Sequence, residues 1–271
     1  MKKLLAVLLA VFLLAAPLTA CGGDDAAESQ TLRVGASPTP HAEILEQCVP
    51  ILEEQGITLE IVEYGDYIVP NTAVEEGEDD ANYFQHQQYL DNFNAENGTH
   101  LVSVVDVHYE PMGIYPGRVD SIDALPDGGT IAVPNDVTNE GRALKLLEAQ
   151  GLITVDPAAG LNATPNDITD NPKNLQFTEL EAAMLPNTVD QFDLNVINSN
   201  YALQAGLNPA TDALASEDAA SDAAQTYANV LVVKEGNEED PRIQALIEAL
   251  TSDAVRTFIE ETYGGSVVPV F

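Results

Sequence analysis

Short apolar runs alternate with amphipathic stretches along most of the chain. Residues 31–37 and 58–64 have the β-rich pattern of strands, and apolar positions recur at helical spacing between them, from residue 41 to about 55. The same alternation continues to residue 116, with a strand predicted over 80–85 and a helix over 86–98 that stops at a glycine. The pattern predicts an α/β fold with largely parallel sheets.

The second half of the chain repeats this theme. A helix is predicted over 139–150, and one long helix over 240–265 begins with Pro and ends with Gly. Residues 212–225 are acidic and rich in Ala, which predicts a loop or a frayed helix. The remaining segments of this half are apolar runs at 130–136, 174–181 and 194–200, a short helix at 201–207, and a strand at 227–235.

The first twenty residues have the composition of a secretory leader. Lys2 and Lys3 precede an apolar run over 4–16, and small residues follow before Cys21. The run is too short for a membrane-spanning helix. The ending "LTAC" resembles a bacterial lipobox, in which the cysteine is lipidated; an ordinary leader with an incidental cysteine is the alternative. We expect a signal peptide at 1–20, a lipid on Cys21 and a flexible tether at 21–30.

Acidic residues dominate the charge of the chain. There are 44 Asp and Glu against 10 Lys and Arg, which gives a formal net charge of −34. Such a surface repels nucleic acids and anionic lipid headgroups, so we expect neither as a partner and expect membrane contact only through the lipid. If Cys21 is lipidated, Cys48 has no intrachain partner, and we expect it to be a small buried apolar side chain.

The sequence carries no recognisable motif of an enzyme. It contains neither the G-x-S-x-G of serine hydrolases nor the G-x-x-x-x-G-K-[ST] of nucleotide-binding loops. A metal receptor would need converging ligands, and His41, His86, His100 and His108 lack a compact spacing such as HxxxH. A solute-binding protein with two α/β lobes fits this composition, while a metal-binding or adhesive surface lipoprotein is the alternative function.

Arg142 is one of few cations and lies at the start of a predicted helix. Its guanidinium offers paired donors that match a carboxylate. Asp136 or Thr138 is expected to cap this helix, and Asn139 shares a helix face with Arg142 because the two are three residues apart. Two interpretations remain open: Arg142 binds the carboxylate of a ligand, or it forms a surface ion pair with Asp136 or Glu140.

The sequence resembles the methionine-binding lipoproteins, the substrate receptors of methionine ABC importers. The resemblance runs from about Leu32 to Phe271 and rests on ordered blocks that include "VGASPTPHAEILE", "DANYFQHQQYLDNFN", "EPMGIYP", "IAVPNDVTNEGRALKLLEAQGLI" and "VINSNYALQAGL". It implies a two-lobed periplasmic-binding-protein fold with crossing strands and a ligand cleft between the lobes. We expect one lobe from 31–114 and 226–271, and the other from 115–225.

The resemblance also implies the ligand and its contacts. It implies capture of L-methionine by lobe closure and delivery to an importer permease by a monomer, without catalysis, cofactor or metal. D-methionine, methionine sulfoxide and a dipeptide that contains methionine remain alternative ligands. Phe84 and His86 share a strand face, whereas Tyr83 points away and is expected to be structural. The expected ligand contacts are Tyr67, Phe84, His86, Tyr89, Asn139, Arg142, Asn198 and Asn229; core packing for the aromatic residues and turn contacts for the asparagines are the alternatives.

Overall fold

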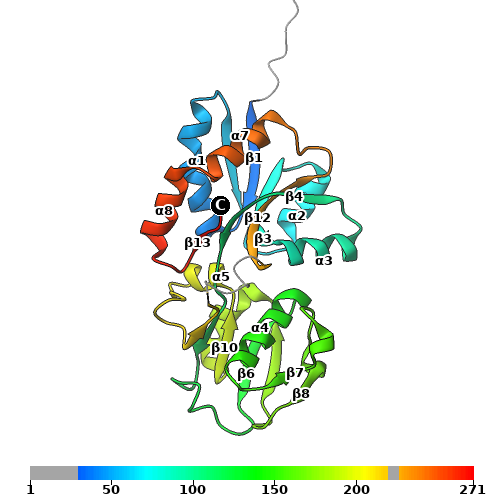
Figure 1. Cartoon of the computed structure of the whole chain (residues 1–271), viewed down its shortest axis with the longest axis vertical. Coiled ribbons are helices and arrows are strands. Elements are labelled where there is room, and N and C mark those ends of the chain that lie inside the picture. Colours follow the sequence, from blue (N-terminus) through cyan, green and yellow to red (C-terminus); the bar gives the residue numbers. More distant parts are fainter. Residues whose placement is uncertain (1–29, 219–225) are drawn as a thin grey trace, which may run out of the picture.

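Two α/β lobes are stacked along the long axis of the molecule (Figure 1). The computed structural model describes residues 30–218 and 226–271. The expected signal peptide, Cys21 and nearly all of the tether lie outside these ranges. Each lobe is built on its own β-sheet with helices packed against it, and the predicted two-lobed α/β fold is therefore confirmed.

The first lobe contains a six-stranded sheet in the order β13-β4-β12-β3-β1-β2. Strands β1, β2 and β3 are parallel, but β12 is antiparallel to both β3 and β4. The prediction of largely parallel sheets was therefore wrong, because β4 leads out of this lobe while β12 returns to it, and the two must run in opposite directions. The strands are β1 (Thr31–Ala36), β2 (Thr58–Glu63), β3 (Ala81–His86), β4 (Leu101–Tyr109), β12 (Ala228–Lys234) and β13 (Val268–Pro269).

Helices of the first lobe cover the sheet and bury a continuous apolar core. The core side chains of β1 pack with those of α1 and the two C-terminal helices, and Cys48 is fully buried among them. Cys48 is a free thiol whose pKa burial raises to about 12, so its predicted role as a small apolar side chain is confirmed. The helices are α1 (Glu43–Glu53), α2 (Val69–Glu76), α3 (Gln87–Asn97), α7 (Pro241–Leu250) and α8 (Asp253–Tyr263).

The predicted long C-terminal helix is two helices. Helix α7 ends at Leu250, and Ser252 accepts a hydrogen bond from the backbone N–H of Val255 to begin α8. A serine side chain at this position satisfies one of the free N–H groups of a new helix, which favours a break over continuation. The break lets both helices pack against α1.

The second lobe contains a five-stranded mixed sheet in the order β11-β5-β10-β6-β9. Helix α4 (Val137–Ala149) packs on this sheet through Ala143, Leu144 and Leu147. The other elements of the second lobe are β5 (Gly113–Pro116), β6 (Thr130–Pro134), β9 (Gln176–Leu180), β10 (Leu194–Ile197), β11 (Ala215–Ser216), α5 (Ser199–Gln204), the β7–β8 hairpin (Thr154–Val155, Ile168–Asp170), and short helical segments at Pro157–Ala159, Pro165–Asp167 and Ala182–Gln191. A further short helical turn, Pro38–Ala42, belongs to the first lobe.

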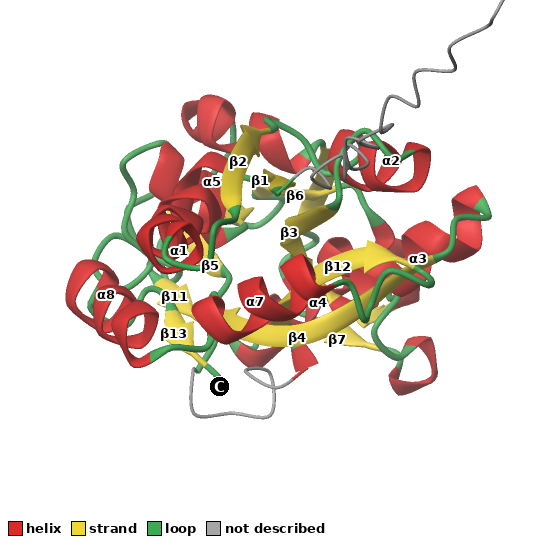
Figure 2. Cartoon of the chain, turned by 90° about the horizontal axis from the view of Figure 1, so that it is seen from above, coloured by secondary structure: helices red, strands yellow, loops and turns green. Residues whose placement is uncertain are grey.

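Strands β4 and β12 are paired side by side along their length (Figure 2). The chain leaves the first lobe at the end of β4. Strand β4 ends at Tyr109 in the first sheet, and β5 begins at Gly113 in the second. The division into 31–114 plus 226–271 and 115–225 stays a prediction. Among the described residues, no helix combines the length and apolar character needed to cross a bilayer.

Candidate functional site

A cavity lies between the two lobes and is lined by residues of both. Residues from β3, α3, β12, α4 and α5 converge there, together with Glu110, which directly follows β4. All eight residues expected to contact a ligand line this cavity, as do four further residues. The lining consists of Tyr67, Phe84, Gln85, His86, Tyr89, Glu110, Asn139, Arg142, Asn198, Ser199, Asn200 and Asn229.

Aromatic rings form one wall of the cavity. Tyr67 lies 5.7 Å from Phe84 and 5.6 Å from Tyr89, measured between ring centroids. The Tyr89 hydroxyl donates to the Tyr67 carbonyl, which fixes the loop before α2 against α3. Behind this wall, the ring of Tyr201 from the second lobe lies 4.9 Å from that of Tyr67 in a tilted arrangement, so the two lobes are in contact there. Tyr83 points to the opposite side and is absent from the lining, as strand alternation predicted.

His86 joins the aromatic wall to the polar part of the cavity. Its Nδ1 accepts a hydrogen bond from the backbone N–H of Tyr89 and caps α3, so the ring proton lies on Nε2. Nε2 then donates across the lobe boundary to Oδ1 of Asn139 at 3.3 Å. Burial, followed by repulsion from Arg142, lowers the His86 pKa to about 3 and keeps the ring neutral.

The first turn of α4 presents Asn139 and Arg142 to the cavity. Asp136 is the N-cap and accepts from the Asn139 backbone N–H at 3.0 Å. The same carboxylate accepts from Nδ2 of Asn139, which leaves Oδ1 to receive His86 Nε2 and Asn198 Nδ2. This arrangement confirms Asp136 as the cap and places Asn139 and Arg142 on one face.

Arg142 is buried and is already paired with a carboxylate of the protein. Its Nε donates to Glu217 Oε1 at 2.8 Å and its Nη2 donates to Glu217 Oε2 at 2.6 Å. Nη2 also donates to the Glu110 carbonyl at 2.7 Å, and the guanidinium lies 4.3 Å from the Tyr227 ring centroid. Burial opposes the charge, but Glu217 more than offsets this and raises the Arg142 pKa. The alternative of a surface ion pair with Asp136 or Glu140 was wrong.

Asn198 and Asn229 use their side chains for tertiary contacts. Asn198 lies at the N-cap position of α5, yet its Nδ2 donates to Asn139 Oδ1 at 2.8 Å and its side chain does not cap the helix. Asn229 Oδ1 accepts from His41 Nε2 at 3.0 Å, because β12 lies between β3 and β4 and faces the turn before α1.

Several buried polar atoms of the cavity have no hydrogen-bond partner among the described residues. They are two acceptors, Glu110 Oε2 and Asn198 Oδ1, and one donor, Asn200 Nδ2. Nε and Nη2 of Arg142 are occupied, so Nη1 is the guanidinium nitrogen left for a further acceptor. Buried polar atoms normally have partners, so this set indicates a polar ligand with both donors and acceptors.

Five residues at or beside the cavity were not predicted from the sequence. Glu110 and Asn200 contribute unpaired atoms, Gln85 and Ser199 complete the lining, and Glu217 orients Arg142. Asn200 also accepts from the Tyr67 hydroxyl at 2.6 Å across the lobe boundary. A usable signal existed for Asn200, which lies two residues after Asn198 at the end of an apolar strand, but none existed for Glu217, one acid among 44.

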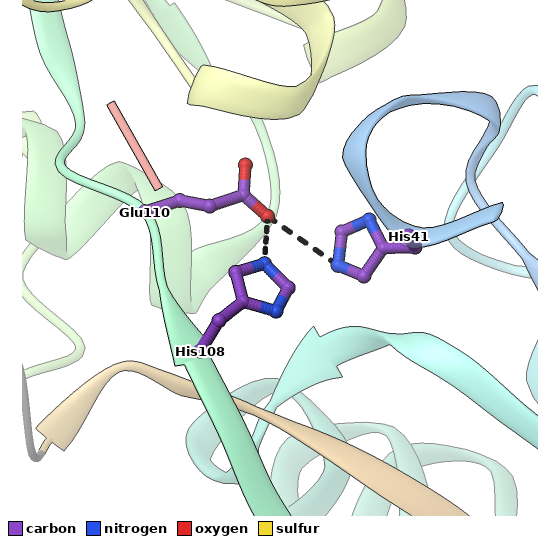
Figure 3. A group of neighbouring side chains, drawn as sticks. All are labelled: His41, His108 and Glu110. Atoms are coloured by element: carbon purple, nitrogen blue, oxygen red, sulfur yellow. Dashed lines mark hydrogen bonds and ion pairs between the residues drawn. The ribbon is translucent and has the colours of Figure 1, made fainter. Parts of the chain in front are cut away.

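His41, His108 and Glu110 form a buried cluster at the edge of the cavity (Figure 3). Both imidazole Nε2 atoms point to Glu110 Oε1, at 3.3 Å from His41 and 2.8 Å from His108. Their ligand atoms all lie within 4.8 Å of one another, so two nitrogens and one carboxylate oxygen could hold a metal ion. The spacing of histidines along the sequence did not predict this cluster, because the fold brings together residues from distant segments.

The contribution of Glu140, in the first turn of α4, to the stability of the folded protein depends on pH. Burial, and then the charge of Glu179, raise its pKa from 4.5 to about 8. The folded state therefore binds the proton more tightly than the unfolded chain does, and stability is lost as pH rises from 4.5 to 8. We expect Glu140→Gln to stabilise the protein by about 1 kcal/mol or more at pH 9, with a smaller gain at pH 5.

Thermal melts at pH 5, 7 and 9 measure this gain. Glu53→Gln on the exposed side of α1 is the control for removal of one negative charge. A gain for Glu140→Gln that is independent of pH, or equal to that of Glu53→Gln, would contradict the prediction.

Comparison with known proteins places the chain in a family. Residues 32–271 match the family model described as NlpA lipoprotein. The methionine-binding lipoprotein MetQ of Bacillus subtilis (strain 168) is 43% identical over 279 residues, covering 100% of this chain and 99% of its own length. A lipoprotein of Ruminococcus gnavus ATCC 29149, solved as a crystal structure, has 54% identity and a TM-score of 0.88 over 89% of this chain and 100% of its own.

A second similar structure was solved with a ligand. It is a nutrient-binding protein of Burkholderia cenocepacia bound to methionine, with 39% identity and a TM-score of 0.84 over 89% of this chain and 100% of its own. The resemblance seen in the sequence is thus confirmed by the family model and by relatives that span nearly the whole chain. This chain belongs to the NlpA lipoprotein family.

Proposed function

We propose that this protein is a receptor that captures L-methionine, or a close relative of it, between its lobes. The observation that carries the proposal is the set of unpaired atoms in the cavity. The unpaired atoms are acceptors on Glu110 and Asn198 and a donor on Asn200. Nη1 of Arg142 is a further donor, since the hydrogen bonds of this guanidinium use Nε and Nη2. A free amino acid supplies the complement, because its ammonium is a donor and its carboxylate is an acceptor.

The ammonium end of the ligand would lie against Glu110. The Oε2 atom of Glu110 and the Oδ1 atom of Asn198 are both buried and can each accept one N–H. An ammonium carries three donors, so two of them would be satisfied by these atoms. Its positive charge would also offset the buried carboxylate, whose pKa burial raises.

The carboxylate end would lie against Arg142 and Asn200. Glu217 holds the guanidinium plane in place from one side, so a ligand carboxylate would meet Nη1 together with Nδ2 of Asn200. Arg142 would thus be a pre-oriented donor, because its hydrogen bonds to Glu217 hold the guanidinium in place before the ligand binds. Pre-orientation reduces the entropy lost on binding.

The aromatic wall suits a thioether. Tyr67, Phe84 and Tyr89 are packed on one another and face the cavity, and a sulfur near their edges gains about 0.3–1.5 kcal/mol per contact. The names of the Bacillus subtilis and Burkholderia cenocepacia relatives support methionine as the ligand class.

The remaining parts of the proposed role follow from the family. Lobe closure would exclude water from the cavity, and the closed receptor would deliver its ligand to an ABC importer permease. A lipid on Cys21 would hold the mature chain on the extracytoplasmic face of the membrane. The protein would act as a monomeric receptor without catalysis or cofactor.

Calorimetry on the soluble chain that begins at Gly22 tests the proposal. The protein is unfolded, dialysed and refolded first, so that ligand carried over from the host is removed. We expect L-methionine to bind, whereas 3-(methylthio)propylamine, which lacks the carboxylate, and 4-(methylthio)butanoate, which lacks the amine, bind at least about 100-fold more weakly. Equal binding of all three compounds, or no heat with L-methionine, would contradict the proposal.

A further inference from the structure

The two oxygens of the Glu110 carboxylate have different surroundings. Oε1 receives the Nε2 atoms of both His41 and His108, at 3.3 and 2.8 Å. Oε2 is buried, and no partner for it lies within the described residues. Figure 3 shows both imidazoles on the side of Oε1, with Oε2 directed away from them. The carboxylate therefore has one occupied oxygen and one free oxygen.

The hydrogen-bond pattern fixes the tautomer of each histidine. His108 Nε2 lies 2.8 Å from Oε1 of the Glu110 carboxylate, which can only accept, so Nε2 carries the proton and Nδ1 is left to accept from the Tyr83 hydroxyl. His41 Nε2 faces two acceptors, Glu110 Oε1 and Asn229 Oδ1, so it also carries its proton. Both rings are neutral, and burial is the first cause of pKa values near 4 for His41 and near 3 for His108.

We propose that His41 and His108 are positioning residues that hold Glu110 with Oε2 toward the cavity, so that the site selects amino acids over the matching α-hydroxy acids. This inference rests on the proposed function, since it assigns the amine of the ligand to Glu110. The groups that face the cluster are Tyr83 on β3, Asn229 on β12, Arg142 on α4 and the backbone N–H of Asn200 on α5.

Charge explains the selection. A neutral imidazole N–H stabilises a carboxylate but does not cancel its charge, and Arg142 is already paired with Glu217. An ammonium at Oε2 would neutralise Glu110, whereas a hydroxyl would donate one hydrogen bond and leave a buried, unpaired charge. Removing a histidine donor lets the carboxylate rotate or take up a proton, and either change weakens the preference for the ammonium.

A metal ion is the competing occupant of this cluster. The hydrogen bonds favour the positioning role, because Nε2 of each ring is protonated toward an acceptor and so offers no lone pair to a cation. Zinc would have to displace both Nε2 protons and break the contacts with Glu110. Zinc binding is thus a distinct outcome that an experiment can detect.

Calorimetry with two ligands on four proteins tests the inference. The ligands are L-methionine and L-2-hydroxy-4-(methylthio)butanoate, and the proteins are wild type, His108→Leu, His108→Gln and His100→Leu. His108→Leu removes the donor to Glu110, whereas the Gln amide restores a donor near Nε2. His100 is a matched control because its side chain is 66% exposed.

We expect His108→Leu to lose about tenfold in affinity for L-methionine and to change hydroxy-acid affinity less than threefold. His108→Gln should regain most of the preference, and His100→Leu should match wild type. Equal losses for both ligands, or no rescue by Gln, would refute a positioning role. A rise in melting temperature with ZnCl₂ that disappears in His108→Leu would also refute it and identify a metal site.

A measurement on the wild-type protein covers the case in which a variant fails to fold. In ¹⁵N NMR of the imidazoles, His41 and His108 should stay neutral, with the proton on Nε2, from pH 8 down to pH 5. Protonation of either ring near pH 6.5 would overturn the inference. Failure of wild type to bind L-methionine would refute the proposed function as well, whereas binding with an unaltered preference in His108→Leu refutes only the positioning role.

Discussion

Arg142→Ala is expected to weaken L-methionine binding by at least about 2 kcal/mol, or roughly 30-fold. The substitution removes the guanidinium that would receive the ligand carboxylate, in a cavity where Arg142 is only 4% exposed. It also leaves Glu217 buried without its cation, so we expect lower stability at the same time. Titration calorimetry of the refolded protein measures the loss of affinity.

The loss of stability can be separated from the loss of binding. In Arg142→Ala/Glu217→Gln the uncompensated carboxylate is gone, and the Gln oxygen can still accept from Tyr109 and the Met112 N–H, as Glu217 does. We expect the double variant to recover much of the stability but none of the affinity. Arg118→Ala is the matched control, because Arg118 is half exposed and pairs with Asp193 away from the cavity. Affinity for Arg142→Ala within threefold of wild type would remove Arg142 from the proposed site.

Gly141→Ala is expected to lower the free energy of unfolding by about 3 kcal/mol. A Cβ at this position would lie 2.1 Å from the Leu161 carbonyl oxygen and 3.0 Å from the Ala163 backbone nitrogen. Both are backbone atoms, which cannot rotate away as a side chain would. The 161–163 loop and α4 must therefore separate, and the helix start that carries Asn139 and Arg142 moves with them.

Urea denaturation measures this effect, with Gly65→Ala as the control. An added Cβ at Gly65 meets no heavy atom within 4 Å, and its φ lies outside the left-handed region, so we expect a change below about 0.5 kcal/mol. Equal unfolding free energies for the two variants would show that the contact between Gly141 and Leu161 is not tight in solution.

Local sequence patterns predicted the elements of the fold more successfully than their directions. The runs that became β1, β2 and β3 had clear alternation, and the glycine predicted to stop α3 does adopt a left-handed φ value. Strand direction failed because it depends on where β12 returns, and nothing within residues 227–235 records that path. The break between α7 and α8 was visible as Ser252 but was outweighed by the helical periodicity on both sides.

For the site, residue type and position predicted placement at the cavity but not pairing. All eight expected residues line the cavity, since each lay at the end or start of an element. The partner of Arg142 was missed because Glu217 is far away in sequence and lies in a segment rich in similar acids. Glu110 was missed for a related reason: its importance comes from His41 and His108, which only the folded chain brings to it.

Hydrogen bonds that join the two lobes directly bear on how far an empty receptor differs from a loaded one. Tyr67 to Asn200 and His86 to Asn139 need no ligand, so they stabilise the joined arrangement whether or not the cavity is filled. A ligand shifts an equilibrium only by its difference in affinity for the two states. For the receptor role proposed above, stronger hydrogen bonds of this kind would raise the apparent affinity while increasing the fraction of closed receptors that hold no ligand.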